Sequence, residues 1–182
     1  MKNIMKWYSY LFFLMFFAQV NAQPIVEIPL GSSANQQTNS HGVYTNLWYD
    51  ADIHTVMFSH RSNDLAGWPS TGNILYDFSI DDGLNWWTDR GPVYFDSLNF
   101  IRSRFPQGAI YNPPGNTNPQ NAFFTTFGAA TDGIDWSHYS QGTVEAGNTL
   151  TFQFTYDCSY YNLMTSIPQS GMLVKNTGTT WW

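Results

Sequence analysis

The chain has enough carboxylate side chains for acid–base chemistry to be considered. Glycoside hydrolysis needs two facing carboxylates at the scissile bond. Four aspartates on predicted loops could supply these carboxylates, but nothing in the sequence places two of them together. We therefore expect solvated turn residues at Asp50, Asp52, Asp64 and Asp96. The sequence therefore predicts no catalytic residue.

The four histidines are His41, His54, His60 and His138, and they show no metal-ligand spacing. His54 and His60 fall on one face of a predicted strand, and we expect ordinary strand histidines. Asp81-Asp82-Gly83 lacks the alternating oxygen ligands of a calcium loop. The sequence thus predicts no metal site and no cofactor.

Residues 79–86, S-I-D-D-G-L-N-W, carry the most specific pattern in the chain. The Ser79 and Asp81 side chains can hydrogen-bond backbone N–H groups within a turn. Gly83 can adopt the positive φ of a sharp turn, and Trp86 can fold its ring back over a hairpin. We predict a β-hairpin whose turn spans Asp81 to Gly83, with Trp86 mostly buried.

The pattern S-x-D-x-G-x-x-W resembles the Asp-box, or BNR repeat, of secreted bacterial proteins with sialidase-like β-propellers. R-F-P-Q-G-A-I-Y-N-P-P-G-N at 104–116 and G-P-V-Y at 91–94 are similar to the same group, so that the resemblance covers residues 28–140. In that family the box lies at blade corners, away from the catalytic centre. The resemblance implies an all-β fold of four-stranded antiparallel propeller blades. The expected strands fill about two to three such blades, so we predict a partial β-propeller that does not close.

Two weaker copies of the pattern follow, T-D-G-I-D-W at 131–136 and N-T-G-T-T-W at 176–181. The tryptophans of the three copies, Trp86, Trp136 and Trp181, are 50 and 45 residues apart. Propeller blades repeat at about 40–50 residues. The alternative is chance, because the chain has 14 glycines and 8 tryptophans.

The resemblance raises the question of sialidase activity. Those enzymes hold a carboxylate with three arginines and use a Tyr–Glu nucleophile pair. Here Arg104-Phe105-Pro106 only loosely matches the family's arginine motif and follows the box instead of preceding it. Glu27 and Glu145 have no adjacent tyrosine, and no arginine can be assigned to the triad. We expect no sialoside cleavage by this chain alone.

Strand signals follow one another along the chain without a convincing helix. The expected strands are Val43–Tyr49, Ile53–His60, Asn73–Ser79, Trp86–Thr88, Gln107–Tyr111, Ala122–Phe127, a weak segment at Trp136–Tyr139, Thr149–Tyr156, Met172–Lys175 and Trp181–Trp182. Since a closed propeller needs at least about four blades, we expect an N-terminal part of a longer protein. The alternative is a small complete sandwich with Asp-box corners.

The first 22 residues have the features of a signal peptide. Lys2 and Lys6 precede an apolar run from Trp7 to Val20, and Val20-Asn21-Ala22 fits a cleavage site. The apolar run is shorter than the ~20 residues of a membrane-spanning helix. We therefore predict a signal peptide at 1–22, one domain at 23–182, a secreted or outer cell-surface location and no membrane span after cleavage.

The net charge is −6, and it becomes −8 once the two lysines of the signal are removed. The remaining cations are spread along the sequence: Arg61, Arg90, Arg102, Arg104 and Lys175. Without a basic patch, nucleic acid and anionic membranes are poor candidate partners. Cys158 is the single cysteine, which excludes an intramolecular disulfide.

Aromatic residues make up 18% of the chain and offer the remaining functional signal. Trp48 and Trp68 are candidates for stacking on sugar rings, and the alternative is that they pack in the core. Other rings near strand ends are Tyr49, Trp87, Tyr160 and Tyr161.

We interpret the chain as a secreted propeller segment with a non-catalytic binding or structural role, with a carbohydrate or another extracellular ligand as partner. The alternatives are the N-terminal part of a sialidase-like glycoside hydrolase whose catalytic residues lie beyond Trp182, and a structural adhesin module.

Overall fold

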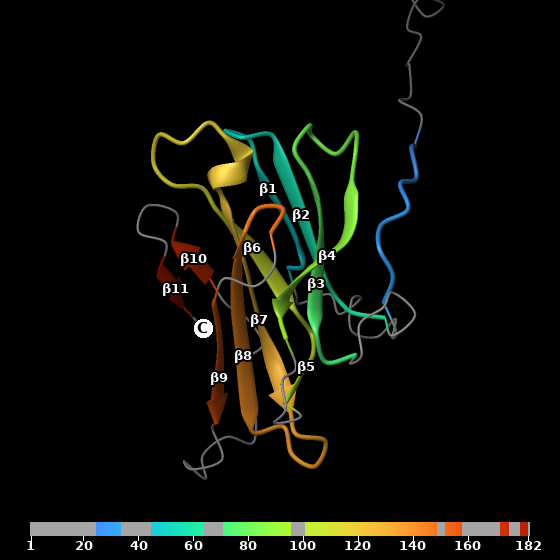
Figure 1. Ribbon diagram of the computed structural model, residues 1–182, viewed down its shortest axis with the longest axis vertical. Helices are drawn as coiled ribbons and strands as arrows, with labels where there is room; N and C mark the ends of the chain where they lie inside the picture. The colour runs from blue at the N-terminus through green and yellow to red at the C-terminus, as the bar shows by residue number, and fades with distance from the viewer. Residues whose placement is uncertain are drawn as a thin grey trace, which may run out of the picture.

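The structure of the protein is a computed structural model. It describes residues 25–33, 45–63, 71–95, 101–148, 152–157, 172–174 and 179–181. Apart from one short 3-10 helix, η3 (Pro119–Asn121), the regular elements of these residues are all strands (Figure 1). None of the described residues forms a helix long and apolar enough to cross a membrane.

The first sheet is an antiparallel meander of four strands that follow one another in the chain. The strands are β1 (Leu47–Asp50), β2 (Thr55–Arg61), β3 (Ile74–Ser79) and β4 (Trp87–Tyr94), in the order β1-β2-β3-β4. Strand β3 is buried on both faces. Its two neighbours, β2 and β4, pair with it along both edges, and the register with β4 shifts at two places.

The second sheet is also antiparallel and is built around β7. Its strands are β5 (Arg102–Ser103), β6 (Gln107–Tyr111), β7 (Phe123–Thr131), β8 (His138–Glu145) and β9 (Phe152–Asp157). Strands β5 and β6 both pair with β7, where Ser103 is opposite Ala130 and Gln107 is opposite Phe127. They therefore act as one edge strand interrupted at 104–106, and the sheet is a second four-stranded meander.

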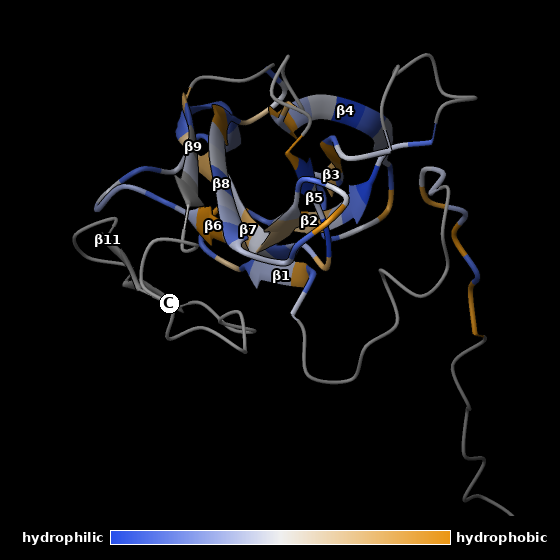
Figure 2. Cartoon of the chain, turned by 90° about the horizontal axis from the view of Figure 1, so that it is seen from below, coloured by the Kyte–Doolittle hydropathy of each residue, from blue (hydrophilic) through white to orange (hydrophobic). Residues whose placement is uncertain are grey.

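A further hairpin joins β10 (Met172–Val174) to β11 (Thr179–Trp181). Figure 2 shows the strands of the two larger sheets curling around a common interior, with β4 arching across at one side. Strand β4 contacts β8, and β1 contacts β6. The two meanders thus face each other across one core.

The core consists of apolar side chains from both sheets. Its central contacts are aromatic: the Phe124 ring lies 5.1 Å from that of Tyr76 and 5.6 Å from that of Phe78, both edge-on. Such edge-to-face pairs add to the stabilisation from burial alone. The other members of the cluster are Ile53, Met57, Val93, Ile110, Ala122, Val144 and Ala146.

Gly142 of β8 lies where β4 approaches most closely. A Cβ on Gly142 would stand 1.8 Å from the carbonyl oxygen of Val93, which is far inside contact distance. Only glycine fits such an approach of two backbones. This residue therefore sets the distance between the two sheets.

The fold class expected from the sequence is confirmed. The described residues are all-β, their two larger sheets are separate antiparallel meanders of four strands, and the strongly curled arrangement is consistent with part of a propeller. Most expected strands are found with shifted ends. The weak segment at 136–139 is the start of the full strand β8, and β5 was not expected.

Candidate functional site

The octapeptide at 79–86 forms the turn between β3 and β4, as predicted. Ser79 Oγ accepts hydrogen bonds from the N–H groups of Gly83 (2.9 Å) and Asp81 (3.3 Å) and donates to Asp81 Oδ1 (2.7 Å). The Asp81 carboxylate also accepts from the backbone N–H and side-chain amide of Asn85. These bonds, led by the Asn85 amide, lower the pKa of Asp81 to about 2.

Trp86 folds back over this turn, and its Nε1 donates to the carbonyl oxygen of Gly83 at 2.9 Å. The ring is half-buried, so the expectation of a mostly buried side chain is met only in part. Gly83 has φ of 89°. The turn thus contains the hydrogen bonds and the positive φ expected of its residue types.

A second contact joins this turn to the neighbouring β1–β2 turn. Asp82 accepts hydrogen bonds from Tyr49 Oη (2.7 Å) and lies 3.0 Å from His54 Nδ1, and its own N–H donates to the His54 carbonyl. Both His54 and Asp82 have positive φ. His54 therefore lies in the turn before β2, not on the strand where we expected it.

The second copy of the pattern, at 131–136, forms a turn with similar capping. Thr131 Oγ1 accepts from Gly133 N–H, and Asp132 Oδ1 accepts from the N–H groups of Ile134 and Asp135. However, this turn joins the second and third strands of its sheet, whereas the first joins the third and fourth. The third copy falls at the β10–β11 hairpin, and its residues 176–178 lie outside the described part of the chain.

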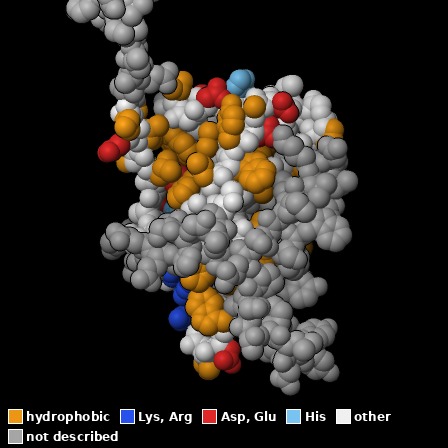
Figure 3. Space-filling view, turned by 180° about the vertical axis from the view of Figure 1, so that it is seen from behind, with side chains coloured by type: hydrophobic (Ala, Val, Ile, Leu, Met, Phe, Trp, Pro, Cys, Tyr) orange, Lys and Arg blue, Asp and Glu red, His pale blue; other side chains and the backbone are white. Residues whose placement is uncertain are grey.

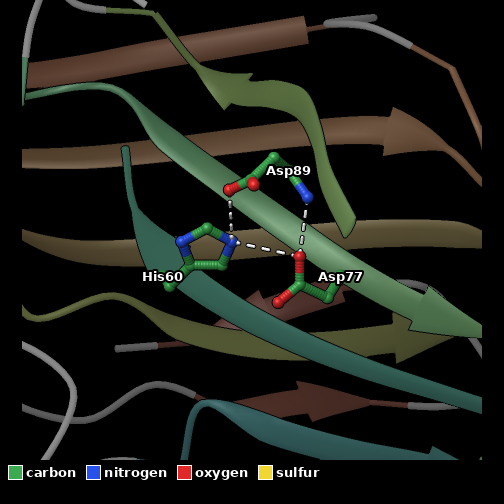
Figure 4. Close-up of side chains that lie close together, drawn as sticks. All are labelled: His60, Asp77 and Asp89. Carbon is green, nitrogen blue, oxygen red and sulfur yellow. Dashed lines mark hydrogen bonds and ion pairs between the residues drawn. The ribbon is translucent and has the colours of Figure 1, made fainter. Parts of the chain in front are cut away.

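His60, Asp77 and Asp89 meet on three adjacent strands, β2, β3 and β4 (Figure 4). His60 Nε2 lies 3.3 Å from Asp77 Oδ1 and 3.8 Å from Asp89 Oδ1. His60 is 1% exposed and Asp77 is 0% exposed, whereas the Asp89 side chain is 29% exposed. We call these three residues the His60 cluster.

A bulge in β4 places Asp89 in this cluster. The β3–β4 register shifts between the pairs Tyr76–Arg90 and Phe78–Trp87, and Asp89 there has φ of 53°. Bulges re-aim side chains in this way. The Asp89 N–H, released from the ladder, donates to Asp77 Oδ1 at 2.7 Å.

The segment before the first sheet covers the His60 cluster. Gly31 N–H donates to Asp77 Oδ2 at 2.9 Å, and Ser32 N–H donates to Asp89 Oδ1 at 3.0 Å. A Cβ on Gly31 would stand 2.6 Å from Asp77 Oδ1 and 2.7 Å from Asp89 Oδ1. Glycine at this position is what lets the backbone reach both carboxylates.

Both ring nitrogens of His60 face oxygen atoms. Nδ1 lies 2.9 Å from the Arg61 carbonyl oxygen, and Nε2 faces the carboxylate of Asp77. Burial by itself lowers the pKa of His60. The hydrogen bonds to Asp77 and Arg61 and the charges of Asp77 and Asp89 outweigh burial, and the net effect is a raised pKa.

Three arginines gather around β5 and the C-terminal end of β2, where Arg61 directly follows His60, which corrects the expectation that the cations are spread out. The Arg61 guanidinium donates to the Thr71 carbonyl and hydroxyl, and Gly72 accepts from Ser103 N–H, which brings β5 beside this turn. Burial, followed by the charges of Arg104 and Arg102, lowers the pKa of Arg61 to about 10. Figure 3 shows a small group of positively charged side chains (blue) at the lower left of this face.

An exposed aromatic pair lies next to these arginines. The Phe105 and Trp136 rings stack with centroids 5.8 Å apart, and Trp136 is 48% exposed. Arg102 Nη1 lies 3.8 Å from where a Cβ on Gly133 would stand, in the same turn as Trp136. We call Arg102, Arg104, Phe105 and Trp136 the arginine–aromatic surface. Arg61 is only 4% exposed and is therefore a buried neighbour of this surface.

The interrupted edge strand holds this surface in place. Phe105 has φ of 51°, and Arg104 N–H donates to the Ala129 carbonyl across the interruption. A Cβ on Gly128 would stand 2.5 Å from the Arg104 carbonyl oxygen. The close approach at Gly128 therefore permits the kink that presents Arg104 and Phe105.

No family model, curated protein or solved structure matches this chain. Any function must therefore be argued from the residues themselves. The Asp-box resemblance remains a prediction that rests on the octapeptide and its turn.

The other candidate residues take different positions. Trp48 is half-buried and packs against the core cluster, so its ring contacts the protein interior. Trp68 and Cys158 lie outside the described residues. Glu145 is opposite Phe123 at one end of β7, and Arg102 is opposite Thr131 at the other end. These two positions of β7 are eight residues apart, or about 26 Å along the strand. The sheet therefore separates this glutamate from the arginines.

Proposed function

We propose that this protein is an extracellular, non-catalytic binding module for acidic glycans, and that the arginine–aromatic surface binds them. The observation that carries the proposal is the gathering of Arg102 and Arg104, next to the buried Arg61, beside the exposed Trp136 ring in a chain of net charge −6. The overall charge repels anions, so a local group of arginines favours a specific anionic ligand over general attraction.

The chemistry of the surface matches two features of an acidic sugar. Arginine forms paired hydrogen bonds to carboxylate or sulfate oxygens. A flat indole ring presents an apolar face on which a sugar ring can stack. Trp136 is supported from behind by Phe105, so that its orientation is set before a ligand arrives.

The experiment is a glycan-binding screen of the chain beginning at Gln23, with uronate, sialate and sulfated glycans compared with neutral ones. We expect binding to acidic glycans that weakens with salt. Arg102→Gln and Trp136→Ala should each reduce affinity about tenfold, equivalent to about 1.4 kcal/mol. Arg90→Gln is the matched control, because Arg90 lies on β4 and donates to the Gly147 carbonyl.

Equal binding of neutral and acidic glycans would overturn the proposal, as would binding that both variants leave unchanged. Binding of acidic peptides without glycan binding would also overturn it, and would assign the arginines to a protein partner.

A further inference from the structure

We propose that the His60 cluster is a binding site for a divalent transition-metal ion of the zinc type, with His60 Nε2, Asp77 and Asp89 as the protein ligands. The site is separate from the arginine–aromatic surface and does not depend on the function proposed for it. It rests on donor chemistry, geometry and charge.

The donor set is one imidazole nitrogen and two carboxylates, which suits zinc and related ions. Ligands about 2.0–2.1 Å from a tetrahedral ion lie roughly 3.3–3.4 Å from one another. His60 Nε2 lies 3.3 Å and 3.8 Å from the nearer oxygens of Asp77 and Asp89. The three donor atoms lie within 4.8 Å of one another, so small side-chain shifts place all three around one ion.

The partners around the cluster orient each donor. The Arg61 carbonyl accepts a hydrogen bond from His60 Nδ1, which leaves Nε2 directed at the carboxylates. This is the arrangement usual for metal-binding histidines. The N–H groups of Gly31 and Ser32 donate to Asp77 Oδ2 and to Asp89 Oδ1, and so fix the orientation of both carboxylates. The β4 bulge and the positive φ of Asp89 bring in the third donor.

The charge of the cluster also favours a cation. The two carboxylates bring negative charge to a position where His60 and Asp77 are almost completely buried. Buried uncompensated charge is costly. A divalent ion with a neutral imidazole makes the same cluster neutral. The partly exposed Asp89 gives the ion a route from solvent.

The test uses the chain beginning at Gln23, stripped of metal with a chelator. We expect saturable binding of one Zn²⁺ by calorimetry, a rise in melting temperature with Zn²⁺, and a tetrahedral absorption spectrum when Co²⁺ is added. Loss of the outer partners of a metal ligand costs about 10–100-fold in affinity. Asp89→Asn, which removes a ligand and keeps the volume, should therefore weaken Zn²⁺ binding at least about 100-fold.

His54→Gln is the matched control. His54 and Asp82 form the other histidine–aspartate pair, with Nδ1 and Oδ2 3.0 Å apart and both side chains exposed. We expect this variant to bind Zn²⁺ as the unchanged chain does. The His60→Gln variant should not bind Zn²⁺. If the His60→Gln variant does not fold, the Asp89→Asn variant decides the question, once its fold has been checked in the absence of metal.

Two results would overturn the proposal. The first is an unchanged melting temperature together with no saturable binding of Zn²⁺ or Co²⁺. The cluster would then be a buried, hydrogen-bonded histidine–aspartate ion pair. The second is binding that survives Asp89→Asn or is lost in His54→Gln, which would place the ion elsewhere.

Discussion

The indole Nε1 of Trp86 donates a hydrogen bond to the carbonyl oxygen of Gly83, at 2.9 Å. This bond holds the β3–β4 turn from its C-terminal side, while Ser79, which accepts from the Gly83 N–H, holds it from its N-terminal side. Two side chains at the ends of an eight-residue segment thus hold one glycine between them. The turn depends on both.

Trp86→Phe keeps an aromatic ring and removes this bond. We expect the free energy of unfolding to fall by about 1 kcal/mol, the usual net value of one hydrogen bond. Urea denaturation measures it. Trp136→Phe serves as the comparison, because the exposed Trp136 ring should tolerate the change within about 0.5 kcal/mol. Equal losses in the two variants would show that the Gly83 bond adds nothing.

Ser79→Ala removes the acceptor of the Gly83 N–H at a fully buried position. Because this partly buried N–H loses its partner, the free energy of unfolding should fall by about 1–3 kcal/mol. Thermal or chemical denaturation checks this value. Thr88→Ala, on the exposed start of β4, should change stability by no more than about 0.5 kcal/mol. A Ser79 variant as stable as the Thr88 variant would contradict the prediction.

Asp81 should titrate well below an ordinary aspartate, with a pKa of about 2. A pKa lowered by folding stabilises the protein above the pKa of the unfolded chain, and this stabilisation is lost as the pH falls toward 2. Carbon-detected NMR of the carboxyl group measures the titration. Asn85→Ala removes the amide that contributes most and should raise the pKa of Asp81, whereas Asn148→Ala should leave it unchanged.

Gly142→Ala should destabilise the packing of the two sheets. The added methyl would stand 1.8 Å from the Val93 carbonyl oxygen, so the backbones must separate. We expect a loss of about 1–3 kcal/mol, the range for overpacking. At Gly108 the nearest atoms are side-chain atoms of Ser59 and Met57, at 3.0 Å and beyond, so Gly108→Ala should cost less. A reversed order of the two variants would be evidence against this account of the interface.

The strands and the first turn could be predicted because their signals are local. Alternating apolar residues and turn residues set β1 to β3, β6 and β7, and the bonds that Ser79, Asp81 and Trp86 make in the 79–86 turn lie within these eight residues. Strand β5 was missed because it has only two residues and depends on its pairing with β7.

The His60 cluster could not be predicted from spacing. Asp77 is 17 residues from His60 and 12 from Asp89, and the three meet only because β2, β3 and β4 lie side by side and a bulge turns Asp89. The arginines were missed for a related reason. Arg61 and Arg102 are distant in the sequence and approach each other only because Ser103 bonds to Gly72.

Each of the two large sheets is made of strands that follow one another in the chain, and this has a consequence for folding. Pairing between neighbours closes short loops, and structures dominated by local contacts fold faster than those with distant pairings. The first meander is complete by Tyr94, before the second begins at Arg102. During synthesis it can therefore form early, and its apolar face then serves as a template on which the second meander docks.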